Sequence, residues 1–479
     1  MTRATENVRS IPRDRCENHG LPEQRQLAVN SFMLLQNGHV TAEFWREPYR
    51  STSPQLLYSL SKSFTSIGVG IAWDEGRLRL EDSVISFFPD KLPEDVSPNL
   101  AKMTVRHLLG MNAGHEGNIY AEVAREEDWI KAFLAMDVEH EPGTHYRYST
   151  HSTYMLAAII ERITGESLVG YLMPRLFEPL GIDRPAWETC PKGVTAGGMG
   201  LSIRTEDIAK FGQMLLNKGT YEGRRIVSEA YIDMATREQS DNRAAASPGR
   251  IDSAQGYGYQ FHLCRRGAYR GDGSFGQLCL VAPNANIVIA ATSSFSSMQQ
   301  LQTLLDLIDV CILDRLDAGR RCYDHGEREL IHELKRLSRA ALPAIRPVPD
   351  GAPSVHGRRY RMQENPERLA EIAFFASGDR LELVLIGADP HRERRLSFDF
   401  RQPVFGEDLF VKDLSEHRQD VAAYAAWEDA RTLKLTLYYI ETPYVITYAI
   451  AFEGETIRLH FHINVSLTLS DYQTSGTLC

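Results

Sequence analysis

The tetrad Ser59-Leu60-Ser61-Lys62 carries the residue types of a nucleophilic site. A serine hydroxyl is a weak nucleophile that needs a base within hydrogen-bonding reach, and a lysine that loses its proton near neutral pH can be that base. Because residues three apart share one face of a helix, Lys62 can hold its amine beside the Ser59 hydroxyl. The N-terminus of the same helix would favour a developing oxyanion. The tetrad alone also fits a plainer interpretation, in which Ser59 is an N-cap and Lys62 is solvated.

The elements that must position this tetrad can be predicted from turn residues and apolar spacing. Asn37-Gly38 stands between two β-rich runs and predicts a hairpin across residues 31–49. Phe64, Ile67 and Ile71 at helical spacing predict a helix that ends near Gly76. Gly68 and Gly70 lower the helix propensity of this segment, so we expect a close packing contact to be the reason for them.

Helical patterns dominate residues 80–240, and strand patterns return after them. Helices are expected at 105–109, 154–163, 168–172, 207–216 and 299–316, and strands at 256–262, 277–283 and 286–292. Strands at both ends of the unit with helices between them predict an α+β domain with one sheet.

A proline-rich segment separates this unit from a second one. Residues 342–354 are expected to be a linker, which gives domains at 1–341 and 355–479. The second domain contains runs such as RLELVLIG and IRLHFHINVSLTL that alternate with period two. These runs predict a small antiparallel barrel or sandwich.

Composition narrows the class of protein. The chain has 479 residues, of which 43% are hydrophobic and 24% charged, as in ordinary globular proteins. The net charge of -10 argues against a nucleic-acid partner. The first 20 residues lack the apolar run of a signal peptide, and no run of about 18 apolar residues occurs. The sequence therefore predicts a cytoplasmic protein with no membrane partner.

Cysteine and histidine spacing gives no strong metal signal. The seven cysteines are an odd number without a CxxC pair, which predicts reduced, buried thiols rather than a zinc site or a redox motif. His460 and His462 lie on one face of an expected strand, a spacing that metal sites use, but no third ligand is evident in the sequence nearby. We therefore expect no metal and no cofactor.

Five ordered blocks extend the pattern beyond the tetrad. They are YSLSKSFTS, TVRHLLGMNAGH, PGTHYRYSTHSTYMLAAIIERITGES, YLMPRLFEPLGI and TAGGMGLSIRTEDIAKFGQMLLNKG. In order and spacing they resemble the class C β-lactamase-like family of serine hydrolases, over about residues 25–310. That family includes DD-peptidases, D-aminopeptidases and carboxylesterases on the penicillin-binding fold. The resemblance implies an α+β fold in which terminal helices flank an antiparallel sheet with a mainly helical insertion, followed here by a C-terminal all-β, barrel-like domain.

The resemblance also assigns roles to residues. The family's nucleophile is the first serine of the S-x-S-K block, which implies Ser59 rather than Ser61. Its Tyr-x-Asn motif falls on Tyr148-Ser149-Thr150, so Tyr148 would share proton transfer with Lys62. A phenol beside an ammonium is expected to have a lowered pKa. Thr150 replaces the asparagine that holds a substrate amide, which weakens the case for β-lactam or peptide recognition.

The family's third motif aligns with Gly271-Asp272-Gly273, where its usual cation is missing. Asp272 would repel an anionic substrate unless Arg270 turns inward, and it would attract an ammonium. The plainer interpretation is a turn-forming acid in a Gly-Asp-Gly loop. By the same alignment the backbone N–H groups of Ser59 and Ser274 would form the oxyanion hole, and Gly273 would leave the strand open to the acyl group.

These assignments predict a metal-free serine hydrolase that forms an acyl-enzyme with a small ester or amide. Carboxylesterase or D-amino amide or peptide hydrolysis is favoured, and β-lactam hydrolysis is an alternative. A catalytically silent homologue used for binding or assembly is a further alternative, because the departures at Thr150 and Asp272 fit it too. Some peptidases similar in the first domain carry a lipocalin-like barrel that shapes the active-site entrance or builds an oligomer, which leaves open a homo-oligomer here. The plainer interpretation of the second domain is a module that adds stability.

Overall fold

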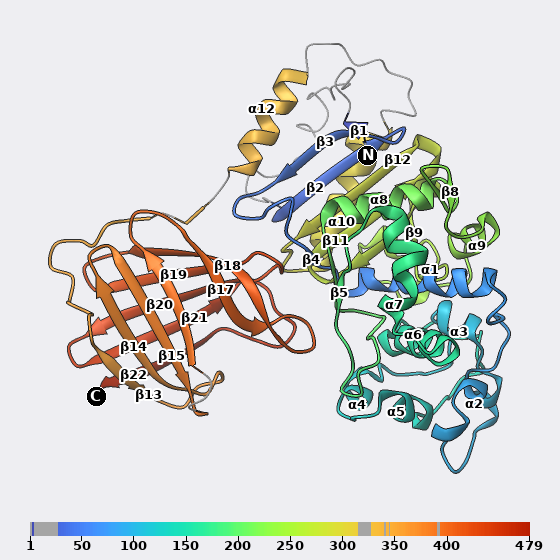
Figure 1. Ribbon diagram of the computed structural model, residues 1–479, viewed down its shortest axis with the longest axis horizontal. Coiled ribbons are helices and arrows are strands. Elements are labelled where there is room, and N and C mark those ends of the chain that lie inside the picture. The colour runs from blue at the N-terminus through green and yellow to red at the C-terminus, as the bar shows by residue number, and fades with distance from the viewer. Residues whose placement is uncertain (1, 4–26, 315–326, 340–341, 344, 390–392) are drawn as a thin grey trace. The chain divides into compact units, whose positions relative to one another are not determined.

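The computed structural model describes residues 2–3, 27–314, 327–339, 342–343, 345–389 and 393–479 (Figure 1). The expectations for residues 4–20, including Cys16, and for Cys322 lie outside these ranges. The chain divides into two compact units, which are described separately. Unit 1 comprises residues 1–45 and 54–337, and unit 2 comprises residues 46–53 and 338–479.

Unit 1 is built on a seven-stranded sheet whose strands come from both ends of the unit. The strand order is β1-β3-β2-β12-β11-β10-β9, and every neighbouring pair is antiparallel except β1 with β3. The strands are β1 (Thr2–Arg3), β2 (Val29–Gln36), β3 (His39–Trp45), β9 (His262–Leu263), β10 (Tyr269–Gly273), β11 (Gln277–Ala282) and β12 (Ile287–Ser293). The predicted hairpin is confirmed, with Asn37 at φ 52° and Gly38 at φ 80° in its turn.

Helices cover both faces of this sheet. Alternate residues of β12, namely Ile287, Ile289 and Ala291, pack with Leu301 of α10 (Met298–Ile308) in one apolar cluster. Val288 points to the other face, where α8 (Thr205–Leu216) lies so close that a Cβ on Gly212 would be 2.5 Å from the Val288 side chain. The period-two alternation of the strand therefore separates two cores.

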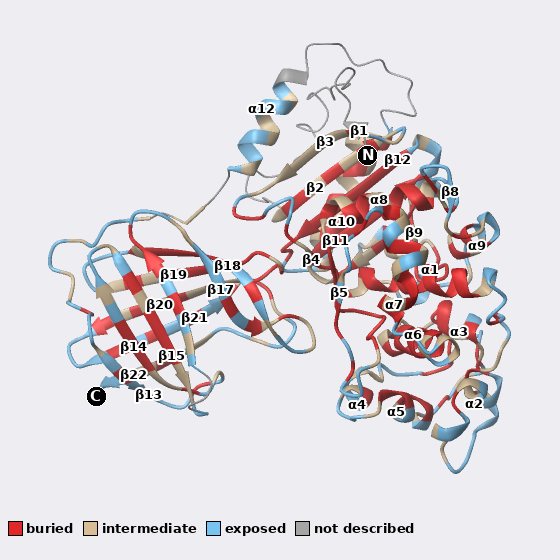
Figure 2. Cartoon of the chain, in the orientation of Figure 1, coloured by how far each residue is buried: buried red, intermediate tan, exposed pale blue. Residues whose placement is uncertain are grey.

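A mainly helical segment lies between β3 and β9 in the sequence. Its centre is α1 (Ser61–Asp74), which is buried along residues 61–72 (Figure 2) and packs against α6 (Thr150–Thr164). The other helices are α2 (Pro98–Lys102), α3 (Val105–Leu109), α4 (Tyr120–Ala124), α5 (Trp129–Ala135), α7 (Leu168–Leu172) and α9 (Glu229–Ala235), and α12 (Glu327–Ser338) ends the unit. Short strands β4 (Gln55–Leu56), β5 (Ala186–Trp187) and β6 (Leu201–Ile203) form a separate small sheet, and β7 (Thr220–Tyr221) pairs with β8 (Arg224–Arg225).

One predicted strand is wrong. Only His262 of the expected strand at 256–262 lies in one, because the backbone turns repeatedly before it. Gly256 and Gln260 have φ values of 102° and 67°, which interrupt an extended chain. The Gln260 side chain donates to the backbone carbonyls of Leu108 and Leu109, so this irregular segment is tied to the end of α3.

Unit 2 contains a ten-stranded antiparallel sheet in the order β16-β15-β14-β13-β22-β21-β20-β19-β18-β17. The terminal strand β16 also contacts β17 and β18, so the sheet curls into a nearly closed barrel, as the sequence predicted. The strands are β13 (Arg359–Met362), β14 (Leu369–Ser377), β15 (Arg380–Gly387), β16 (Glu393–Asp399), β17 (Val404–Val411), β18 (Glu416–Trp427), β19 (Thr432–Tyr439), β20 (Val445–Glu453), β21 (Thr456–Ile463) and β22 (Tyr472–Leu478).

Residues 46–53 belong to unit 2 although they follow the first hairpin in the sequence. The Glu47 N–H donates to the Ser338 carbonyl, and the buried Tyr49 ring meets Tyr438 edge to face at 6.4 Å. Arg50 lies 4.3 Å from the centre of the Phe405 ring. The domain limits at 341 and 355 stay a prediction. Residues 46–53, here called the strap, show that unit 2 also includes a segment that precedes α1 in the sequence.

Two remaining sequence expectations can be compared with the structure. Cys190, Cys264 and Cys279 are buried free thiols as expected, and Cys479 is a free thiol but exposed. Cys311 is disulfide-bonded, so the prediction of reduced thiols is wrong there. Within the described ranges, the helices are all too short or too polar to cross a bilayer.

Candidate active site

Ser59 lies where a short 3-10 turn, η3 (Tyr58–Leu60), runs into α1. Every residue from 55 to 72 is buried except Ser59. The preceding Tyr58 has φ 48°, a left-handed conformation that costs energy for a bulky side chain. The turn thus presents one hydroxyl at the surface of an otherwise buried segment.

Lys62 sits one turn further along and is only 2% exposed. Its Nζ lies 3.0 Å from Ser59 Oγ and 3.2 Å from Thr150 Oγ1, and it donates to the Gly198 carbonyl at 2.6 Å. The i, i+3 spacing therefore brings the amine to the hydroxyl as expected, and Thr150 at the start of α6 joins it.

Tyr148 lies two residues before α6 and reaches the same group. Its phenol is hydrogen-bonded to the Ser59 side chain, and Lys62 Nζ lies 5.0 Å from the centre of its ring. Burial raises the pKa of the Tyr148 phenol well above its usual value, and the Ser59 bond offsets only part of this effect. The expectation of a lowered phenol pKa is therefore wrong, because desolvation outweighs the neighbouring cation.

The strand β10 runs against the segment that holds Ser59. A Cβ on Gly271 would lie 2.4 Å from Ser63 Oγ, and one on Gly273 would lie 2.1 Å from the Leu57 carbonyl oxygen. Close packing thus requires both glycines, Gly271 against a side chain and Gly273 against the backbone. This is a different reason from the open approach to an acyl group that we expected of Gly273. Asp272 lies between them on the strand, so it does not form the turn that the plainer interpretation required.

Arg270 turns inward and neutralises Asp272. The Arg270 Nε donates to Asp272 Oδ2 at 2.8 Å, and the guanidinium, 1% exposed, also donates to the Asp252 carbonyl. Burial would raise the pKa of the Asp272 carboxyl, but Arg270 first and then His262 and Arg250 bring it below its usual value. The carboxylate is therefore charged, and its charge is compensated by a buried cation.

Ser274 follows β10 and completes the predicted set. The next residue, Phe275, has φ 64°, and its ring meets Tyr58 edge to face at 5.2 Å. Left-handed residues therefore flank both Ser59 and Ser274, and their rings pin the two backbone turns together.

Three groups at this site were missed from the sequence. The Gly198 carbonyl has no side-chain signature, although the TAGG block contains it. His262 stacks on Tyr148 with ring centres 6.1 Å apart, and Tyr257 meets His262 at 4.9 Å. Burial lowers the pKa of His262 to about 4, so this ring is neutral. The aromatic run after Gly256 was the available signal, but it was interpreted as strand.

The chain is similar to known proteins in sequence and in fold. A family model described as Beta-lactamase matches residues 18–308, more than half of the chain. The chain belongs to the beta-lactamase family. The 6-aminohexanoate-dimer hydrolase of Paenarthrobacter ureafaciens is 27% identical over 295 residues, which cover 57% of this chain and 75% of that protein.

Two further similar proteins are covered by this chain to different extents. Protein flp of Staphylococcus aureus (strain MW2) is 27% identical over 167 residues, or 31% of this chain and 33% of that protein. A solved structure from Bacillus anthracis, provisionally assigned as a 6-aminohexanoate-dimer hydrolase, covers 66% of this chain and 88% of its own at 21% identity and a TM-score of 0.53. Together the family match and the hydrolase relative support a serine hydrolase in general terms.

Proposed function

We propose that this protein hydrolyses a small ester or amide through an acyl-enzyme on Ser59. The observation that carries the proposal is the half-exposed Ser59 hydroxyl, 3.0 Å from the buried Lys62 amine. In this scheme Ser59 Oγ attacks the carbonyl carbon and its proton passes to the neutral amine of Lys62, while Tyr148, whose raised pKa keeps it a protonated phenol, takes part as a donor. The same pair returns a proton to the leaving group, and water then releases the acyl group.

The oxyanion would be stabilised by the backbone N–H groups of Ser59 and Ser274. The contact of Gly273 with the Leu57 carbonyl and the packing of Phe275 on Tyr58 support this assignment, because both fix the two turns against each other. Preorganised donors of this kind typically contribute about 3 kcal/mol to lowering the barrier.

The electrostatics around Asp272 favour an uncharged acyl group. The Arg270 guanidinium is bonded to Asp272 and is therefore not free to clamp a substrate carboxylate, as a β-lactam would require. The compensated carboxylate is likewise a weak attractor for an ammonium. We favour carboxylesters and neutral amides. D-amino amides, whose acyl group carries an ammonium, and the zwitterionic 6-aminohexanoate dimer that the name of the relative from Paenarthrobacter adds are the charged substrates to be tested against them.

Active-site labelling tests this function directly. We expect a fluorophosphonate to give one stable mass adduct, which Ser59→Ala abolishes together with turnover of p-nitrophenyl esters. Ser61→Ala is the matched control, because Ser61 is fully buried and its Oγ accepts from the Leu201 N–H. This variant should label normally. Absence of any adduct on the wild-type protein would favour the silent homologue instead.

We further propose that unit 2 mediates self-association, as the sequence analysis left open. Sedimentation of the full chain, compared with a chain ending at residue 337, tests this role. If both samples sediment with the mass of one chain, unit 2 does not mediate self-association.

A further inference from the structure

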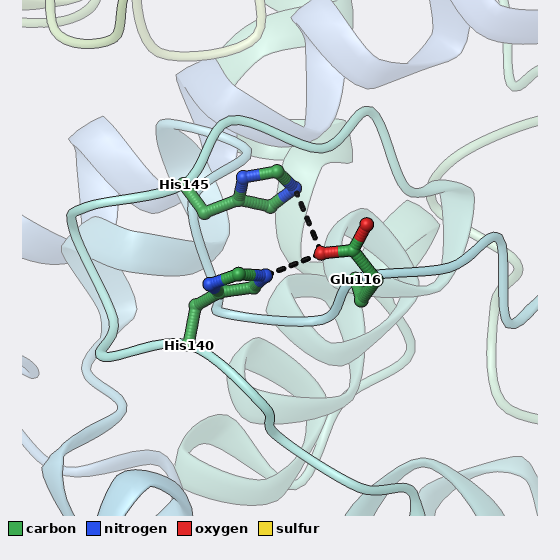
Figure 3. A group of neighbouring side chains, drawn as sticks. All are labelled: Glu116, His140 and His145. Atoms are coloured by element: carbon green, nitrogen blue, oxygen red, sulfur yellow. Dashed lines mark hydrogen bonds and ion pairs between the residues drawn. The ribbon is translucent and has the colours of Figure 1, made fainter.

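Away from Ser59, Glu116, His140 and His145 bring two imidazoles and one carboxylate together (Figure 3). His140 Nε2 is bonded to Glu116 Oε2, and His145 Nε2 lies 4.0 Å from the same oxygen. The two imidazole rings stack with their centres 4.2 Å apart. One donor atom from each residue lies within 4.8 Å of the other two.

Backbone bonds hold the two histidines side by side. The Thr144 N–H donates to the Glu141 carbonyl, and this turn places His140 and His145 on either side of it. Gly143 within the turn has φ 94°, and its N–H donates to the Asn112 carbonyl. The pair is therefore fixed by the backbone and not only by its own ring contact.

The segment that carries Glu116 is fastened to the first histidine. The His140 N–H donates to the Gly114 carbonyl, and a Cβ on Gly114 would lie 2.4 Å from the His140 carbonyl oxygen. Gly114 has φ 103°, which other residues rarely adopt. The Glu116 N–H donates to Glu139 Oε2 at 3.0 Å, which adds a second tie between the segments.

This arrangement matches the ligand set of a divalent transition metal. Two imidazole nitrogens and a carboxylate oxygen are suited to Zn²⁺, which binds such donors at about 2.0–2.2 Å and completes its coordination with water. The side chains of Glu116, His140 and His145 are 64%, 38% and 34% exposed, so an ion can reach them from solvent. Both imidazole nitrogens already point to the same Glu116 oxygen, so side-chain rotation that brings the three donors closer would complete the set.

We propose that Glu116, His140 and His145 form a Zn²⁺-binding site, distinct from the hydrolytic site, that staples the loop at 140–145 to the loop at 114–116. The stapled loop leads after three residues to Tyr148, so a bound ion would rigidify the approach to that residue. The ion would add a binding function that the hydrolytic mechanism does not need.

Calorimetric titration of the chelator-treated full chain with ZnCl₂ at pH 7.5 tests the proposal. We expect one saturable site, weakened at least tenfold by Glu116→Gln, which keeps an acceptor for His140 but removes the anionic ligand, and by His145→Ala. The matched control is His462→Ala, since His462 is an exposed histidine bonded to Asp471 alone among the described residues. This variant should bind as the wild type does.

Cobalt gives a second readout that does not depend on activity. Visible absorption of the Co²⁺ form should show a nitrogen- and oxygen-ligated ion and should disappear in both site variants. Cys479→Ser removes the exposed thiol and should leave the signal intact. No saturable Zn²⁺ binding, or binding that Glu116→Gln and His145→Ala leave unchanged, would overturn the proposal.

Discussion

The amine of Lys62 is held by partners from three separate segments, and their chemistry differs in a useful way. The Gly198 carbonyl can only accept, so it anchors one N–H. The hydroxyls of Ser59 and Thr150 can either donate or accept. A neutral Lys62 can therefore stay anchored to Gly198 while its lone pair receives the Ser59 proton. In the proposed mechanism Thr150 would thus act on the amine, which is a different task from holding a substrate amide.

Replacing Thr150 with valine should lower activity through Lys62. Thr150→Val keeps the branched shape that packs on Gly198 but removes the oxygen 3.2 Å from Lys62 Nζ. We expect kcat/KM for a p-nitrophenyl ester to fall roughly 10–100-fold, since one hydrogen bond to a charged group contributes about 1.5–3 kcal/mol. Thr153→Val is the matched control, because the Thr153 hydroxyl donates to Gln260 and does not touch Lys62. Equal losses of activity in both variants would contradict this role.

Side-chain spacing made part of this site predictable. The helical repeat predicts that Ser59 and Lys62 lie together, and the order of the motifs adds Tyr148 and Thr150. In each case the type of the side chain identifies the position in the sequence. The Gly198 acceptor is a backbone atom that any residue would supply, so sequence cannot single it out. The pKa of Tyr148 is raised where the sequence predicted a lowered value. The direction of this shift depends on how deeply the phenol is buried, which only the folded chain determines.

At the scale of elements, two glycines of α1 allow other side chains to pack closely against the helix. A Cβ on Gly70 would lie 2.4 Å from the Tyr231 ring, whereas one on Gly68 would meet only the ends of Ile160 and Leu172 at 3.3 Å. The sequence predicted a close contact from the cost of glycine in a helix, and both contacts confirm it. It could not tell which glycine was the tighter one, because the partners lie far along the chain.

This difference predicts unequal effects of two alanine substitutions on stability. Gly70→Ala should lower the free energy of unfolding by about 1–3 kcal/mol, because an aromatic ring in a packed core must move. Gly68→Ala should be close to neutral, since flexible side-chain ends can yield and alanine gains about 1 kcal/mol of helix propensity. Urea unfolding of the two variants checks the prediction, and equal destabilisation would contradict it.

At the scale of the whole molecule, the chain divides into two units, and the sequence predicts only part of this division. Alternating runs predicted the second unit, because the residues of a strand face inward and outward in turn. Along β21, Ile457, Leu459, Phe461 and Ile463 are buried and the residues between them are exposed. The strap at 46–53 carries no such pattern. Its assignment to unit 2 depends on long-range contacts such as Tyr49 with Tyr438, which no local signal encodes.

Among the described residues of unit 1, the enclosed imidazoles of His115, His151 and His262 couple stability to pH. Burial lowers the pKa of His115, His151 and His262 from 6.5 to about 4 in each case. Between these values the unfolded chain takes up protons that the folded chain does not, so the free energy of unfolding falls as pH drops from 6.5 towards 4. Above pH 6.5 the full stability is present. Each shift corresponds to about 3 kcal/mol at the acidic end.

Urea unfolding of unit 1 between pH 6 and 5 should therefore show a slope of about three protons or more taken up on unfolding, because burial also lowers the pKa of His107. His151→Met should reduce this slope by about one third, because both ring nitrogens of His151 are buried without a hydrogen-bond partner in the part of the chain that the structure describes. The substitution removes a titrating group but retains an apolar side chain between Trp129 and Tyr154. A slope that His151→Met leaves unchanged would mean that other groups take up the protons, and that burial of these histidines does not set the acid limit of the fold.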